Sequence, residues 1–144
     1  MNDRERVNST AIRGLLHAAN AVHLQLESRL AELGLSLPKL AALAALREAG
    51  DSLLLSQLAE RLSCVKSNIT QLVDRLESDG FVKRGLDPGD RRARLAVLTT
   101  AGRVACDLGT QAQADAEQGL LVGFTHDEAR QLKMLVDRLS GEPG

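Results

Sequence analysis

Residues 66–99 read KSNITQLVDRLESDGFVKRGLDPGDRRARLAVLT, and this stretch decides the fold. Its first part has apolar residues with the i, i+3, i+4, i+7 spacing of a single helix face, namely Ile69, Leu72, Val73 and Leu76. The spacing predicts an amphipathic helix over Lys66–Ser78, and Gly80 provides the signal that ends it.

The second part of this stretch is rich in turn residues and positive charge. Phe81–Arg84 and Arg94–Thr99 have the composition of two short strands, and the segment between them, Leu86–Arg92, contains Pro and Gly among charged residues. Only Asp87 and Asp90 oppose the basic side chains here, which are Lys83, Arg84, Arg91, Arg92 and Arg94. The pattern predicts a basic β-hairpin directly after the helix.

The residues upstream complete a recognisable order of elements. Ser56–Leu62 reads as a short helix with Ser56 as its N-cap, and the turn Ser63, Cys64, Val65 joins it to the next helix. Two short helices at this spacing are typical of a helix-turn-helix. The hairpin behind them is then a wing, which predicts a winged helix-turn-helix.

Long helices flank this unit on both sides. Apolar periodicity predicts an amphipathic helix over 7–33, and Ser36 is placed to cap a buried helix over Leu37–Ala49. Further helices are predicted over Ala101–Leu121 and Asp127–Leu139, the last one with a Thr125/Glu128 capping box. The predicted fold class is therefore mainly α, with a small β-hairpin wing and flanking helices.

Composition and the distribution of charge limit the classes of function that the chain can have. The chain of 144 residues has a net charge of −1, but residues 56–100 are locally basic, with eight basic and six acidic side chains. Its two cysteines and three histidines form no metal-ligand or disulfide pattern, and no nucleophile–base arrangement or phosphate-binding glycine loop occurs. We therefore expect a protein without cofactor or metal that is not an enzyme. Because secretory and membrane-spanning signals are also missing, we expect it to be cytoplasmic.

The polar face of the helix at 66–78 has side chains suited to reading DNA. Opposite its apolar face lie Ser67, Asn68, Thr70, Gln71 and Arg75, and Lys66 stands at the N-terminal flank, where it can meet a phosphate. Asn and Gln pair with adenine in the major groove, and Arg pairs with guanine. An ordinary solvated helix face would show the same polarity. Asp74 must lie beyond the DNA phosphates or pair with a neighbouring Arg.

The sequence of the predicted helix and hairpin resembles that of a known family. The run ITQLVDRLESDGFVKR over Ile69–Arg84, followed by DPGDRRARLAVLT over Asp87–Thr99 and then by Ala101 and Gly102, resembles the multiple-antibiotic-resistance regulator (MarR) family. The resemblance includes the wing signature D-x-R, which falls on Asp90 and Arg92.

For the DNA-binding residues, the resemblance implies two groups. It assigns Lys66, Ser67, Asn68, Thr70, Gln71 and Arg75 to the recognition helix, and Asp90, Arg91, Arg92 and Arg94 to the wing. Arg92 would enter the minor groove, and Asp90 would brace the wing by pairing with an Arg. Val65 departs from the usual Ser or Thr cap of the recognition helix, which leaves Ser63 or a DNA phosphate to take that role.

The resemblance also implies a domain organisation. Residues 1–144 would form one domain, in which 36–100 is the winged helix-turn-helix with its wing at 81–99, and 1–34 and 101–144 are dimerisation helices. A two-fold homodimer would bind a pseudopalindromic operator in double-stranded DNA, with recognition helices about one helical turn apart. The expected function is that of a repressor, although activation, which depends on operator position, stays open.

The signal that relieves repression is less defined. MarR-like proteins commonly respond to small, often aromatic and anionic molecules, and Arg13 and His17 on the first helix are the candidate effector-binding residues. One alternative is a thiol switch, because Cys64 precedes the recognition helix and Lys66, where a thiolate would be favoured. Another alternative is a winged-helix protein-interaction module that never binds DNA.

Overall fold

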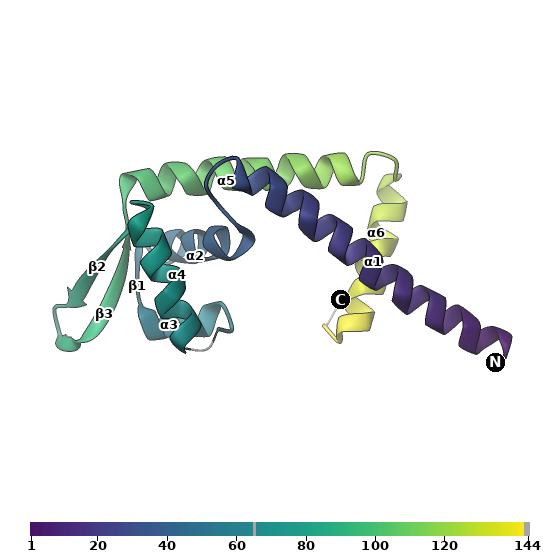
Figure 1. Cartoon of the computed structure of the whole chain (residues 1–144), viewed down its shortest axis with the longest axis horizontal. Helices are drawn as coiled ribbons and strands as arrows, with labels where there is room; N and C mark the ends of the chain where they lie inside the picture. Colours follow the sequence, from purple (N-terminus) through teal and green to yellow (C-terminus); the bar gives the residue numbers. More distant parts are fainter. Residues whose placement is uncertain (65, 143–144) are drawn as a thin grey trace.

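The structure is a computed structural model that describes residues 1–64 and 66–142; within α4, the side chains of Lys66 and Ser67 also lie outside the described part. The described chain forms six helices and one small sheet (Figure 1), which confirms the predicted fold class. In chain order the elements are α1 (Asp3–Ala31), α2 (Leu37–Glu48), β1 (Ser52–Leu54), α3 (Leu55–Arg61), α4 (Lys66–Ser78), β2 (Val82–Asp87), β3 (Asp90–Leu98), α5 (Thr100–Leu120) and α6 (His126–Ser140).

The hydrophobic core lies among α2, α3, α4 and the sheet, which form the winged unit, and Leu30 of α1 and Cys106 of α5 also belong to it. Its largest fully buried side chains are Leu30, Leu43, Leu46, Leu58, Ile69, Val73 and Leu76. Three of the four apolar residues expected on the inner face of α4 are therefore fully buried, and Leu72 is half-buried against the same core. This confirms both the bounds and the orientation of α4.

The sheet is antiparallel, with strand order β1-β3-β2. Two features differ from the prediction. The hairpin strands are longer than their composition had indicated, because Leu86 pairs with Arg94 and Asp87 pairs with Asp90 across a two-residue tip at Pro88 and Gly89, with an irregularity in register between these two pairs. The short strand β1 was not predicted at all; Leu53 pairs with Ala96 and its side chain enters the core.

Helix caps explain where the helices begin. The Ser36 hydroxyl accepts the amide of Lys39, and Thr125 and Glu128 form the predicted reciprocal capping box. The prediction for Ser56 was wrong: α3 begins at Leu55, and the Gln57 side chain accepts the amide of Leu54 in place of a hydroxyl cap. The first helix also begins earlier than predicted, at Asp3, because Asn2 and Glu5 form a capping box.

Helices α1, α5 and α6 extend away from the winged unit. Figure 1 shows α5 leading from the base of the wing to α6, while α1 lies beside α5 near its C-terminal end and diverges toward the N-terminus. None of the side chains of α6 is buried, and the N-terminal half of α1 is exposed along its whole length. Among the described residues, no helix has the combined length and apolarity needed to cross a membrane.

Polar contacts attach these helices to the winged unit. The Glu27 carboxylate of α1 accepts the amide of Leu37 at 2.5 Å, so it satisfies a free N–H at the start of α2. Arg47 of α2 pairs with Asp107 of α5, and the Arg103 guanidinium of α5 reaches Asp51, with 2.9 Å between Nε and Oδ2. Two ion pairs, one from α2 and one from the turn that follows it, therefore hold α5 against this part of the chain.

The start of α5 packs tightly on the turn between α4 and β2. Thr99 caps α5 by accepting the amide of Gly102, and the Thr99 hydroxyl donates to the carbonyl of Gly80 at 2.7 Å. A Cβ on Gly102 would clash with the carbonyl oxygen of Phe81 and would lie 2.8 Å from a Leu98 methyl. Only glycine allows this approach, because the Phe81 carbonyl is part of the backbone and cannot rotate away as a side chain could.

We expect Gly102→Ala to lower the free energy of unfolding by about 2 kcal/mol or more, since the clash is with a backbone carbonyl that cannot move aside. The matched control on the same helix is Gly109→Ala, whose Cβ would meet only the ends of the Leu35 and Leu40 side chains. Its cost should be about half as large. Urea titration measures both, and equal losses would contradict this account of the junction.

Candidate nucleic-acid interface

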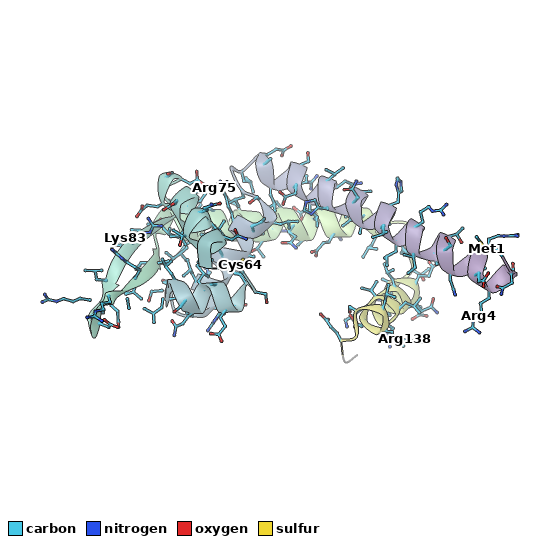
Figure 2. All side chains as sticks on the ribbon, turned by 60° about the horizontal axis from the view of Figure 1, so that its bottom comes forward. Met1, Arg4, Cys64, Arg75, Lys83 and Arg138 are labelled. Carbon is cyan, nitrogen blue, oxygen red and sulfur yellow. The ribbon has the colours of Figure 1, made fainter. Side chains whose placement is uncertain are left out.

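The outer face of α4 presents the polar side chains expected of a recognition helix. Asn68, Thr70, Gln71 and Arg75 are all exposed, because burial of the opposite face turns them outward. Figure 2 shows Arg75 on α4 and Lys83 on the neighbouring strand β2. The predicted roles of Lys66 and Ser67 concern side chains outside the described part of the chain, and Val65 lies outside the described residues.

The wing carries its arginines on the solvent side of β3. Arg91, Arg92 and Arg94 are exposed, and Arg91 and Arg92 lie next to the hairpin tip. Asp90, which is expected to brace the wing by pairing with an Arg, contacts Arg92 through the backbone of that residue. The Asp90 carboxylate accepts the backbone amide of Arg92 at 3.0 Å, because the tight tip brings this amide within reach. Asp90 thus braces the wing through the backbone, and the Arg92 guanidinium stays exposed.

A groove separates the recognition helix from the wing and encloses about 590 Å³. Helix α4, the start of α3 and the two hairpin strands supply its lining, which consists of Leu54, Leu55, Ser56, Ile69, Thr70, Arg84, Arg92, Ala93 and Arg94. Among the lining arginines, Arg92 and Arg94 make the groove locally positive, although the whole chain has a net charge of −1.

Arg84 is the one member of the predicted basic cluster with a different role. Its guanidinium pairs with the Asp74 carboxylate of α4 and lies 3.7 Å from the Glu77 carboxylate. Of the two alternatives predicted for Asp74, a position beyond the DNA phosphates or a pair with a neighbouring Arg, the structure shows the pair. Sequence reasoning could not choose the partner, because the choice depends on β2 folding back along α4.

The turn before α4 contains Ser63 in a left-handed conformation, with φ of 52°. Cys64 follows and is half-buried, with its Sγ 3.7 Å from the carbonyl of Leu62. Its amide donates to the carbonyl of Ala59 at 2.9 Å. Cys106 is buried in the core. A redox role for Cys64 stays a prediction.

The candidate effector residues lie far from the winged unit. Arg13 and His17 are exposed on the N-terminal half of α1, and the nearest polar contact of the Arg13 guanidinium is Ser9 at 3.5 Å. A separate cavity of about 400 Å³ lies between α1 and α5, lined by Gln25, Ser28, Arg29, Asp115, Ala116, Gly119 and Leu120. The structure does not bring Arg13 or His17 to this cavity. Within residues 1–64 and 66–142, no cluster of His, Cys, Asp and Glu is arranged to hold a metal ion.

Helix α4, its preceding turn and the hairpin define a winged helix-turn-helix protein, and comparison with known proteins specifies the class further. A family model described as "MarR family" matches residues 33–93. The reduced form of MarR from Escherichia coli is 30% identical, with a TM-score of 0.75 over 87% of this chain and 93% of that one. The chain belongs to the MarR family.

Two further relatives are informative. A mutant of Escherichia coli MarR in complex with operator DNA is 28% identical, with a TM-score of 0.76 over 90% of this chain and 93% of that one. The transcriptional activatory protein BadR of Rhodopseudomonas palustris is 31% identical over 111 residues, which are 76% of this chain and 63% of BadR. For the first curated relatives, the match spans about half of the relative's own length.

Proposed function

We propose that the chain is a sequence-specific regulator of transcription that binds double-stranded DNA as a homodimer and acts as a repressor. One observation carries the proposal: the exposed polar face of α4 and the exposed arginines of the wing border the same positive groove. Membership of the MarR family supports it, since a solved relative is a complex with operator DNA.

In the proposed complex, α4 lies in the major groove. Asn68 and Gln71 are placed to bond adenine edges, and Arg75 to bond a guanine or a phosphate. The wing then reaches the adjacent minor groove, where Arg92 with Arg91 meets the negative potential of a narrow A·T-rich segment. Specific recognition therefore comes from α4, whereas the wing adds affinity and a preference for groove shape.

The dimer follows from apolar side chains that the described chain leaves exposed. On α6, Leu132, Leu135 and Leu139 lie on one face, and the latter two are each 58% exposed. The N-terminal half of α1 and the α5–α6 turn expose more, namely Val7, Ile12, Leu15, Leu16, Leu121, Val122 and Phe124. Exposed apolar side chains in this number are typical of a surface that is buried by association. A second copy of the chain is the proposed partner, and its two-fold symmetry makes the operator a pseudopalindrome.

Control by a small molecule is the finer part of the proposal. The proposed ligand site is the cavity between α1 and α5, and α5 leads directly from the wing. Arg29 in the cavity lining is suited to bind an anionic group. A ligand that altered the angle between these helices would change the separation of the two recognition helices. The name of BadR supports one alternative, activation in place of repression.

Arg92→Ala should weaken binding to any duplex and lower the slope of log affinity against log salt concentration by about one unit, because one phosphate neutralisation is lost. Fluorescence anisotropy at several salt concentrations measures the slope. Unchanged affinity and slope would favour a protein-interaction module over a DNA-binding regulator.

Gln71→Ala should change which sequence is preferred, at a cost of about 1–3 kcal/mol at a single base pair if the side chain bonds an adenine. The measurement compares the affinities of wild type and variant for duplexes that differ at one position of the half-site. Equal weakening on all of these duplexes would remove Gln71 from base recognition.

Leu135→Glu should convert the dimer to a monomer, because it places a charge in the apolar face of α6. Sedimentation velocity reports the mass, and circular dichroism reports whether the helices persist. The matched control is Arg130→Glu, a charge change at another exposed position of the same helix, which should remain dimeric. If Leu135→Glu does not fold, Leu135→Ala should still raise the concentration at which the dimer dissociates. A monomeric wild type would contradict the dimer.

A further inference from the structure

We propose that Arg84 acts as an internal counter-ion of the recognition helix: it offsets part of the negative charge of the Asp74 and Glu77 carboxylates so that α4 can approach DNA phosphates. The inference rests on the proposed DNA-binding function. It separates Arg84 from the other arginines of the groove, which are proposed to meet DNA themselves.

The contacts of Arg84 are all directed at α4. Its Nη2 pairs with Oδ1 of Asp74 and lies 3.4 Å from the backbone carbonyl of Thr70, and its Nη1 lies 3.7 Å from Oε1 of Glu77. Its backbone amide donates to the other oxygen of Glu77 at 3.2 Å. Two carboxylates and one helix carbonyl therefore surround a single guanidinium.

Exposure shows which of these groups would face a duplex. The Arg84 side chain is 29% exposed, whereas the side chains of Asp74 and Glu77 are 55% and 44% exposed. The two carboxylates are thus more accessible to solvent than the guanidinium between them. A guanidinium held in this way is poorly placed to reach a phosphate, but it reduces the negative potential of both carboxylates.

The position of the acidic pair makes this partial neutralisation necessary. Asp74 follows Thr70 by four residues and precedes Glu77 by three, so the three side chains share the edge of α4 that borders the wing. Without Arg84, two negative charges would stand beside the positive groove and repel DNA phosphates. The requirement is local, because it depends on where the charges lie and not on the net charge of the chain.

A double-mutant cycle tests the role. Arg84→Met keeps the aliphatic stem and removes the charge; it should weaken binding to an operator duplex by roughly ten-fold, since like charges at an interface are costly. Arg84→Met combined with Asp74→Asn has the wild-type net charge and should regain most of that loss. In the wild-type background, Asp74→Asn should change affinity far less than it does beside Arg84→Met.

The matched control neutralises a different carboxylate. Asp79 lies just beyond α4 and pairs with Lys39 of α2 at 2.7 Å, so its carboxylate faces away from the wing. Arg84→Met combined with Asp79→Asn has the same net charge as the rescued variant and should remain as weak as Arg84→Met alone. Thermal unfolding of each variant shows that the fold is retained, and Arg84→Lys, which keeps a charge, should bind more tightly than Arg84→Met.

The outcomes separate this inference from the proposed function. If wild type binds but Asp74→Asn gives no rescue, and the salt slope falls by about one unit with Arg84→Met, Arg84 contacts a phosphate and the inference is wrong. Equal rescue by Asp74→Asn and Asp79→Asn would reduce the effect to net charge and would also overturn it. Failure of wild type to bind any duplex would instead refute the proposed function, and this inference with it.

Discussion

Burial of one face of α4 is the constraint on which the rest of the structure depends. Ile69, Val73 and Leu76 are withdrawn from solvent against α2 and α3, and they set the rotation of the helix about its axis. A rotation of one residue, about 100°, would place polar side chains in the core, where they would lack partners. The outward direction of Asn68, Gln71 and Arg75 is therefore a consequence of core packing.

The same packing determines where the wing lies. Because β2 follows α4 after a short turn at Gly80, it must run back beside the helix, and Arg84 pairs with Asp74 as a result. The turn is held from the other side by Thr99 and by the close approach of Gly102 to the carbonyl of Phe81. Recognition helix, wing and α5 thus meet at one junction.

Much of this arrangement could be predicted from sequence because it depends on local periodicity. The face of α4, the caps at Ser36 and Thr125 and the presence of a basic hairpin all follow from residues close together in the chain. The features that composition and periodicity missed depend on backbone geometry and on contacts made in the folded chain. Strand β1 exists because β3 offers it an edge, and the Asp90 carboxylate bonds an amide that only the tight hairpin tip brings near. The pairing of Arg84 likewise required the fold.

The outer helices of the single chain leave apolar side chains exposed to solvent. The apolar face of α6 is solvent-exposed in a chain whose core is otherwise closed around α2, α3 and α4, and α1 extends well past the winged unit (Figure 1). In Figure 2, Met1, Arg4 and Arg138 lie at the end of the molecule opposite to Lys83 on the wing. A second copy joined at that end would hold two winged units at a set separation, which is the geometry that a two-fold operator requires.

The most direct test of the central claim is selection of bound duplexes from a random pool at about 150 mM salt, near physiological ionic strength, followed by sequencing. The account predicts enrichment of a pseudopalindrome whose half-sites lie about one helical turn apart, and loss of that enrichment with Arg92→Ala. A pool that stays random, with wild type and Arg92→Ala behaving alike, would contradict it.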